Sequence, residues 1–343
     1  MTFAILSGLL IGILFGFALQ RGRFCMNSAI RDSILLKDFT LLKAVGVAVL
    51  VQLLGFTILA MLNAITLNPK PLFWGAQLVG GFIFGIGMVL AGGCASGITY
   101  RVGEGMVGAM SAVIGLSIGG SLTAMGFLKP IMSFLQTKTK VSVGEANPTL
   151  ANVLGLNHAL VAIVVFIIVV VVWGLLARNN QDEEDASTAP LFERIFKQGW
   201  KWLPTGIVVG IIGILAYLSS AAAGTNYPLR ITSGWITFVK MILPMEAAIN
   251  WDAYLILGII IGALIASLIA GEFKFRMPGW VMLGQTFGGG LLMGFGAVTG
   301  AGCNVTHILS GLPQLSIGSA LATIAIALGA WMTSYLIFIR PNK

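Results

Sequence analysis

The chain has 343 residues, of which 57% are hydrophobic and 9% charged, and its mean hydropathy is +0.96. This composition excludes a soluble globular domain. Because the apolar runs are continuous rather than alternating as in a β-barrel, it indicates an all-α polytopic protein embedded in membrane lipid. The net charge of +8 is interpreted as a determinant of membrane topology rather than as a nucleic-acid-binding surface.

Nine apolar segments have about the 20-residue length that a membrane-spanning helix needs. In chain order they are residues 3–20, 41–65, 74–93, 106–127, 158–177, 204–223, 253–270, 281–301 and 315–339. Four semi-apolar segments are too short to cross a bilayer, namely 23–36, 94–104, 230–243 and 303–312. Such segments predict re-entrant loops or half-helices, which are tolerated where protein surrounds them or where they line a cavity.

The order of these segments repeats. Residues 1–128 contain four spans and two short segments, and residues 204–343 contain the same elements in the same order. Residues 129–203 hold the single connecting span and a linker. Two four-span repeats separated by one span must have opposite orientations, so the sequence predicts an inverted-topology repeat with a substrate site near the midplane.

The distribution of charge predicts the orientation. With the N-terminus outside and the C-terminus inside, most Lys and Arg residues fall on the inner side, as the positive-inside rule requires. The main inner linker covers residues 178–202. Its acidic run from Asp182 to Asp185 is interpreted as solvated, and the stretch from Leu191 through Trp200 and Trp202 as a helix lying on the membrane surface.

The third span of each repeat ends on the same glycine-rich signature. At a constant offset, the two signatures share four glycines and a cysteine: Gly81/Gly290, Gly85/Gly294, Gly87/Gly296, Gly93/Gly302 and Cys94/Cys303. Two of the three cysteines in the chain therefore occupy matched points of the repeat. This placement favours a role on one substrate path, although a buried cysteine can also be simply a small apolar residue.

A helix that begins just after Cys94 or Cys303 would point its free N–H groups and the positive end of its dipole at that cysteine. The expected anion sites are formed by Gly93, Ala95 and Ser96 in the first repeat and by Gly302 and Asn304 in the second. Burial favours a protonated thiol, and a neutral S–H group is a weak donor suited to a soft acceptor such as sulfur. The alternative is transient thiol–disulfide chemistry, which needs a thiol of low pKa.

Three further residues are candidates with competing interpretations. His307, one helical turn past Cys303, is either a substrate or proton ligand or a packing residue. Arg101 follows Cys94 on its short segment and lies either within the membrane, where ionisable groups are usually functional, or at the interface. Cys25 follows two arginines, but the matching segment near Arg230 has no cysteine, so the repeat does not support it. Without a CxxC pair, a His cluster or an ATP-binding motif, no metal or cofactor is expected.

The contexts of Cys25, Cys94 and Cys303, together with the nine-span pattern, resemble the YeeE/YedE sulfur-transport family over essentially the whole chain. The resemblance implies a bacterial inner-membrane protein that takes up thiosulfate. It also implies an hourglass-like shape whose central constriction is lined by the three cysteines, and an association with a small TusA-like sulfur carrier in the cytoplasm. Related family members are linked to selenium.

The resulting hypothesis is a transporter rather than an enzyme. Thiosulfate would enter an outer mouth, bind helix N-termini near Gly302 and Asn304, and pass between Cys303, Cys94 and Cys25 through S–H···S contacts. One alternative is a facilitator for another small sulfur or selenium species. The other is a membrane thiol–disulfide oxidoreductase or sulfurtransferase that uses the same cysteines.

Overall fold

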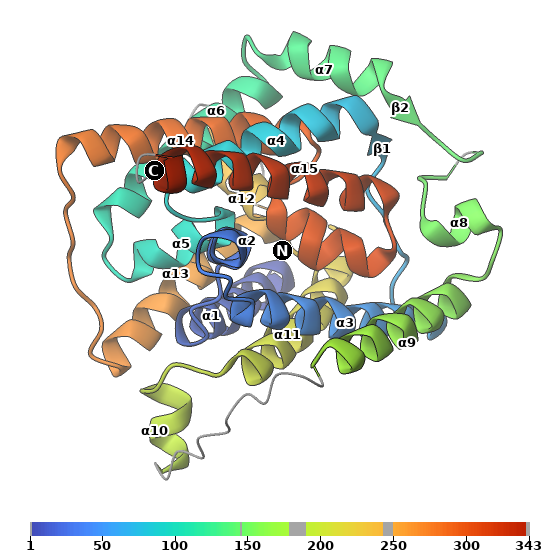
Figure 1. The fold of residues 1–343 in the computed structure, drawn as a ribbon, viewed down its shortest axis with the longest axis horizontal. Helices are drawn as coiled ribbons and strands as arrows, with labels where there is room; N and C mark the ends of the chain where they lie inside the picture. Colours follow the sequence, from blue (N-terminus) through green and yellow to red (C-terminus); the bar gives the residue numbers. More distant parts are fainter. Residues whose placement is uncertain (1, 145, 178–189, 243–249, 341–343) are drawn as a thin grey trace.

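The computed structural model describes residues 2–144, 146–177, 190–242 and 250–340, and these are almost entirely helical (Figure 1). The first half contains α1 (Thr2–Arg21), α2 (Met26–Leu35), α3 (Thr40–Met61), α4 (Trp74–Leu90), α5 (Ala95–Gly103) and α6 (Val107–Ala124). The second half contains α11 (Trp202–Ala222), α12 (Ile231–Ile242), α13 (Trp251–Ile269), α14 (Trp280–Thr299), η1 (Val305–Gly311), η2 (Leu312–Gln314), α15 (Ile317–Ser334) and η3 (Tyr335–Ile339). The connecting region contains α7 (Lys129–Lys138), α8 (Leu150–Leu154), α9 (His158–Ala177) and α10 (Leu191–Phe196).

Nine helical stretches among the described residues are long and apolar enough to cross a membrane, which confirms the predicted all-α polytopic class. Three of them combine a long helix with the short helix that follows it, namely α1 with α2, α4 with α5 and α15 with η3. All four predicted short segments are short helices, which are α2, α5, α12 and η1 with η2. In lipid this outcome is expected, since a helix satisfies its backbone hydrogen bonds internally.

The long helices pack in pairs that join the two halves. Helix α1 packs along α13, and the corresponding pair is α11 with α3. Helix α6 packs along α14, and the corresponding pair is α15 with α4. Helices α4 and α14 also contact each other, and so do α1 and α11. In Figure 1, α4, α14 and α15 lie across the upper part and α1, α3 and α11 across the lower part, with α2 and α5 between them. Each of these four pairs therefore has a counterpart when the first four spans are exchanged with the last four in order.

The crossing of α4 and α14 depends on glycine. A Cβ atom added at Gly296 would lie 2.5 Å from the carbonyl oxygen of Gly80, and one added at Gly87 would lie 2.6 Å from that of Gly289. Neither helix backbone can accommodate such a contact. Small residues at these positions let the two backbones approach closely, which is how helices associate where water provides no hydrophobic driving force.

Parts of the connecting region, and the segment just before α4, differ from the sequence-based predictions. Helices α7 and α8 and the two-residue antiparallel strands β1 (Leu72–Phe73) and β2 (Lys140–Val141) were not predicted. The predicted surface helix is only α10, because the chain turns after Phe196 and α11 begins at Trp202. The acidic run from Asp182 to Asp185 lies outside the described residues.

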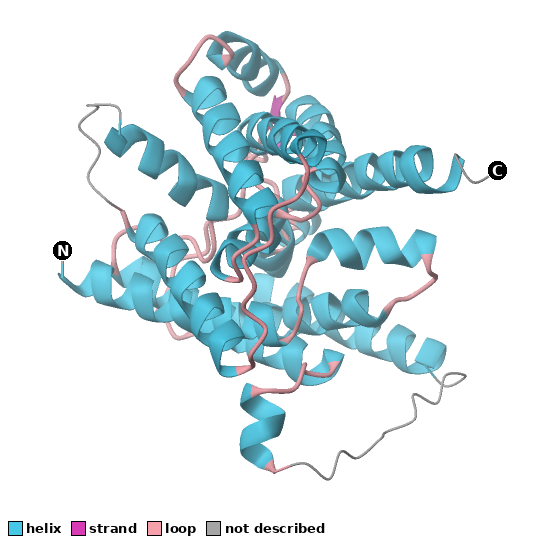
Figure 2. Ribbon diagram, turned by 90° about the vertical axis from the view of Figure 1, so that its left-hand side faces the viewer, coloured by secondary structure: helices cyan, strands magenta, loops and turns pink. Residues whose placement is uncertain are grey.

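Helix α9 stands apart from the paired helices. It contacts α3 and α8, and the Trp173 ring stacks on Trp202 at the start of α11 with 6.0 Å between centroids. Val161 and Ala162 are buried, but most of its large apolar side chains are exposed, which suits a helix surrounded by lipid. Figure 2 shows the first helix beginning at one side of the molecule and the last helix ending at the other, as an odd number of spans requires.

Candidate functional site

Each of the three cysteines lies immediately before a short helix. Cys25 is the N-cap residue of α2 and Cys94 that of α5, whereas Cys303 directly precedes Asn304, the N-cap residue of η1. The Sγ atom of Cys94 accepts a hydrogen bond of 3.3 Å from the backbone N–H of Gly97. All three sulfurs therefore lie at the end of a helix where free N–H groups favour negative charge.

The turns before Cys94 and Cys303 have the same backbone conformation. Gly92 has φ +70° and Ala301, at the equivalent position of the second half, has φ +66°. Glycine adopts this left-handed conformation freely, whereas alanine adopts it only with strain. Retention of the conformation at Ala301 indicates that the surrounding packing requires this turn.

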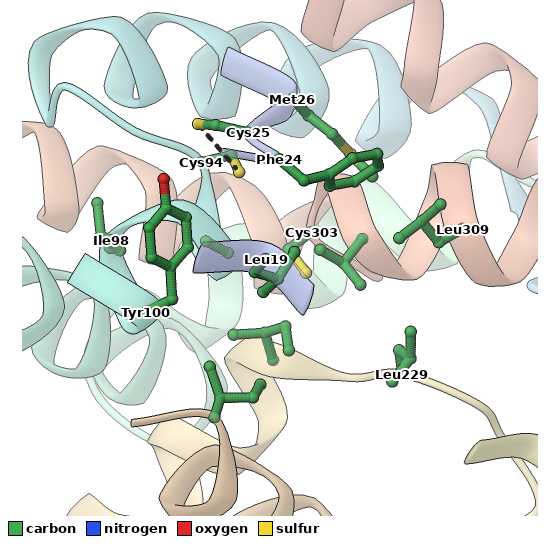
Figure 3. Packing of buried hydrophobic residues seen from close by; sticks show 14 of the residues in the cluster. Leu19, Phe24, Cys25, Met26, Cys94, Ile98, Tyr100, Leu229, Cys303 and Leu309 are labelled. Carbon is green, nitrogen blue, oxygen red and sulfur yellow. Dashed lines mark hydrogen bonds between the residues drawn. The ribbon is translucent and has the colours of Figure 1, made fainter. Parts of the chain in front are cut away.

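The thiols of Cys25 and Cys94 are in direct contact. Their Sγ atoms lie 3.7 Å apart, and Cys94 Sγ is 3.5 Å from the Ser96 hydroxyl (Figure 3). Both cysteines are free and buried. The structure therefore brings together two cysteines that are 69 residues apart in the chain, one of which the repeat alone did not support.

Cys303 belongs to the same buried cluster but stands apart from this pair (Figure 3). It is fully buried, and its Sγ atom is 3.4 Å from the Thr306 hydroxyl. Its neighbours in the cluster include the apolar side chains of Leu19, Leu229 and Leu309. A sulfur species that moved between Cys303 and the other pair would thus be surrounded by apolar side chains.

Asn304 joins the short segments. Its Oδ1 atom accepts a hydrogen bond of 3.4 Å from the backbone N–H of Ala95, and its Nδ2 group donates to the Met26 sulfur at 2.9 Å. Asn304 is completely buried. One amide therefore links the N-termini of α5 and α2 to the start of η1, and sequence spacing gave no indication of this link.

His307 is held by the scaffold. Its Nδ1 atom is 3.2 Å from the Ser319 hydroxyl and its Nε2 atom 3.1 Å from the carbonyl oxygen of Gly300. A Cβ added at Gly302 would lie 2.9 Å from the same Nε2 atom. With both ring nitrogens engaged, His307 fixes the turn before Cys303 in this conformation.

A cationic group lies on the side of the molecule that carries the α3–α4 loop. Lys70 Nζ is 4.4 Å from the centroid of the Tyr227 ring, and the Tyr227 hydroxyl donates to the carbonyl oxygen of Thr306, at 3.0 Å. Burial, aided by the positive charge of Arg230, lowers the pKa of Lys70 to about 8. Arg230 itself pairs with Asp252 at 2.8 Å. Sequence spacing gave no indication that Lys70 and Arg230 lie close together.

A second charged group lies on the opposite side, which we call the linker side because α10 reaches it. Glu272 pairs with Arg21 and, at 2.8 Å, with Arg23, and Glu104 pairs with Arg23 at 3.4 Å. The Gln20 amide donates to both carboxylates. Arg21 also donates to the carbonyl oxygen of Lys197 at 2.8 Å, which ties the linker to α1.

Arg101 lies near the linker side, at the end of α5. Its guanidinium donates to the carbonyl oxygen of Gly92 and lies against the backbone of Gly93, where an added Cβ would be 3.0 Å from Nη1. The guanidinium carbon is 5.7 Å from the Tyr100 ring centroid. Within the described ranges, no group of three or more His, Cys, Asp or Glu side chains is placed to hold a metal ion.

A model of proteins described as sulphur transport matches residues 21–332. The chain belongs to this sulphur transport family. It is 39% identical to the thiosulfate transporter TsuA of Spirochaeta thermophila, in an alignment that covers 97% of this chain and 99% of the relative. It is 31% identical to the thiosulfate transporter TsuA of Escherichia coli, over 99% and 96% of the two chains. A 117-residue stretch is 33% identical to the probable transporter YedE of Escherichia coli, covering 34% of this chain and 28% of that one.

Membership of the sulphur transport family agrees with the site geometry. The matched region contains all three cysteines and the short helices that follow them. The relatives with near-complete coverage are both named as transporters. The chain is thus a multi-pass membrane protein of a transport family, and the roles of individual residues are matters for the proposal below.

Proposed function

We propose that this protein carries thiosulfate across a bacterial inner membrane, with its N-terminus outside, its C-terminus in the cytoplasm and no enzymatic activity. The observation that carries the proposal is the contact between the Cys25 and Cys94 thiols at the N-termini of two short helices. Two near-full-length relatives named as thiosulfate transporters support the choice of substrate. In this orientation the Lys70 side faces outward and the linker side faces the cytoplasm.

In the proposed path, the substrate first meets the side that carries Lys70 and Arg230. A positive field there would raise the local concentration of a dianion. The anion would then reach Cys303 and the start of η1, where Gly302, Asn304 and backbone N–H groups contact its oxygens. Helix N-termini stabilise an anion without the tight grip of an ion pair. Weak binding at several successive points suits a substrate that must leave again.

The terminal sulfur of thiosulfate would pass from Cys303 to the pair formed by Cys94 and Cys25. Neutral thiols suit this step, because an S–H group donates weakly and a thiolate would repel the anion. Gly93, Ala95 and Ser96 would contact the oxygens at the α5 N-terminus, where the N–H of Gly97 already engages the Cys94 sulfur. Arg101 would attract the anion toward the linker side. The predicted role of His307 becomes a positioning role at the turn before Cys303.

The paired packing of the helices supports an inverted repeat of residues 1–128 and 204–343, connected by 129–203. On this division the path runs between the halves, where α4 meets α14 and α1 meets α11, and it crosses the pseudo-twofold axis, which lies in the membrane plane. The cysteines would line its narrowest part, as an hourglass-like shape implies. A small TusA-like sulfur carrier would then receive the product at the linker side.

The contact between two thiols also favours a second candidate function, thiol–disulfide exchange. Cys25 and Cys94 would form a disulfide if their sulfurs approached from 3.7 Å to about 2.05 Å, while a substrate disulfide was reduced to two thiols. This function predicts a mixed disulfide with a partner. It is separated from transport by trapping with a Cys25→Ala variant, which would leave Cys94 without its resolving thiol.

The first test is uptake of radiolabelled thiosulfate into cells that lack other importers. The wild type is compared with Cys25→Ser, Cys94→Ser and Cys303→Ser, which keep size and a hydrogen-bond donor but remove the soft sulfur. Ser334→Ala is the matched control, because it alters a buried hydroxyl on α15 that has no hydrogen-bond partner among the described residues. Uptake by the wild type and the control, with loss in the cysteine variants at equal membrane levels, supports the proposed path. Normal uptake by Cys94→Ser would contradict it.

A further inference from the structure

A pocket of about 320 Å³ opens near the linker side, next to the turn that carries Cys94. It lies between α5, the start of α6 and the loop that joins α13 to α14. Its lining includes two guanidinium groups, three thioethers and the backbone of Gly92, from Arg101, Arg276, Met106, Met277 and Met282. This volume is at the lower end of the range for small-molecule sites and suits a compact ligand.

Two guanidinium groups line this pocket without a carboxylate partner. The carboxylates on the same side, Glu104 and Glu272, pair with Arg21 and Arg23 instead. Neither Arg101 nor Arg276 forms an ion pair with any residue in the described ranges. Arg101 is half-buried and Arg276 is exposed. A guanidinium without a counter-charge favours an incoming anion, because its planar fork can bind two oxygens at once.

Arg276 is fixed beside the pocket by its backbone. Its N–H donates to the carbonyl oxygen of Gly105 at 3.1 Å, and its own carbonyl oxygen accepts from Val107, also at 3.1 Å. These bonds attach the α13–α14 loop to the turn between α5 and α6. The position of Arg276 therefore follows that of α5, whose N-terminal residue follows Cys94.

Arg101 connects the pocket to the cysteine pair. Its guanidinium donates to the carbonyl oxygen of Gly92, two residues before Cys94, and lies against Gly93. The guanidinium also interacts with the Tyr100 side chain, and it forms no ion pair in the part of the chain that the structure describes. An anion that leaves the Cys25–Cys94 pair toward the linker side would thus meet Arg101 first.

Three methionines supply the rest of the chemistry. Met106, Met277 and Met282 present flexible, polarisable thioethers to a pocket that is otherwise apolar between its arginines. A ligand with an anionic oxygen end and a soft sulfur end matches such a lining better than sulfate, which has no soft end, or an acyl chain, which has no charge.

We propose that this pocket is a second anion site, which takes a sulfur oxyanion after it has passed the cysteine pair. The oxyanion end binds the guanidinium groups of Arg101 and Arg276, and the sulfur end contacts the methionines. The inference rests on the proposed function for its direction and for the choice of thiosulfate as the probe. It assigns Arg276, which the sequence did not single out, to substrate binding on the linker side.

The test compares thiosulfate transport in right-side-out and inside-out membrane vesicles, since the latter present the linker side to the bath. Arg276→Gln should raise the half-saturating thiosulfate concentration roughly tenfold in inside-out vesicles, the scale of one charge-assisted contact. In right-side-out vesicles it should change less than twofold. Arg276→Lys, which keeps the charge but loses the planar fork, should lie between wild type and Arg276→Gln.

Lys274→Gln is the matched control, because Lys274 is an exposed cation in the same loop that does not line the pocket. It should leave both half-saturating concentrations unchanged. If Arg276→Gln behaves like Lys274→Gln in both vesicle types, the site is wrong and the transport function stands.

A wild type that transports no thiosulfate in either vesicle type would contradict the proposed function instead. The pocket is then judged by equilibrium binding of radiolabelled thiosulfate to the purified full-length protein. Binding that Arg276→Gln weakens roughly tenfold and Lys274→Gln does not would support the site. Binding that is absent, or that is equal in all three proteins, would overturn it.

Discussion

The guanidinium of Arg230 lies 2.8 Å from the carboxylate of Asp252, a side chain with no exposure to solvent. Arg230 precedes α12 as Cys25 precedes α2, so the second half carries an ion pair at the position where the first half carries a thiol. Neither Asp252 oxygen accepts a well-aligned hydrogen bond from the described residues. The charge of Asp252 is therefore compensated chiefly by Arg230.

Removal of Arg230 should leave an unpaired buried carboxylate. We expect Arg230→Met to destabilise the protein by about 3–5 kcal/mol, as measured by thermal unfolding in detergent. The double variant Arg230→Met/Asp252→Asn should recover most of this loss. A single variant as stable as the wild type would show that the pair contributes little.

The protonation of Lys70 should control uptake at alkaline pH. Its pKa is lowered to about 8, so the positive charge is complete well below pH 8 and is lost as the pH rises through that value. We expect the half-saturating thiosulfate concentration to rise severalfold between an external pH of 7 and 9. Lys70→Arg stays charged throughout and should remove this dependence.

The lowered pKa of Lys70 affects stability in the opposite direction to uptake as the pH rises. Because Lys70 binds its proton less tightly in the folded protein than its ordinary pKa of 10.5 implies, its contribution to stability rises between about pH 8 and 10.5. Loss of uptake at pH 9 would therefore not arise from unfolding through Lys70. An equal loss in the wild type and Lys70→Arg would assign the pH dependence to another group.

The Asn304 amide should be needed for the arrangement of the short helices. Asn304→Ala removes the acceptor for Ala95 and the donor to Met26 at a fully buried position. We expect a loss of about 1–3 kcal/mol in stability and a lower maximal uptake rate. Thermal unfolding and uptake are measured on the same preparations, with Ser334→Ala as the neutral control. Unchanged uptake would contradict a role for this contact in the path.

The contact between α4 and α14 at Gly296 should leave no room for an added methyl group. We expect Gly296→Ala to lower stability by about 1–3 kcal/mol, because its Cβ would meet the Gly80 carbonyl oxygen. Gly284→Ala on the same helix, where no atom lies within 4 Å of an added Cβ, should be neutral or up to about 1 kcal/mol more stable. Similar thermal unfolding of the two variants would show that the crossing can relax.

The spans and the short helices were predictable from sequence because their signals are local. A continuous apolar run identifies a span whatever its neighbours are, and the paired Gly-rich signatures marked where α5 and η1 begin. Helix α7 escaped prediction because none of its residues is buried and its sequence is not apolar. Its existence depends on its place at the edge of the bundle.

The assembled site was less predictable because its contacts join distant parts of the chain. Cys25 and Cys94 are 69 residues apart, and Asn304 is 209 residues from Ala95 and 278 from Met26. The repeat did not support Cys25, since its counterpart near Arg230 has no cysteine. Only the folded arrangement brings its sulfur next to Cys94 and leaves Arg276 beside Arg101.

Helix α9 has a consequence for how such a protein can arise. Two identical copies of a four-span unit joined end to end would insert with the same orientation, because four crossings return the chain to its starting side. The lipid-exposed α9, attached to the bundle mainly through α3 and α8, adds the single crossing that reverses the second copy. On the proposed repeat, one added helix of ordinary apolar sequence is enough to convert a tandem duplication into a two-sided conduit.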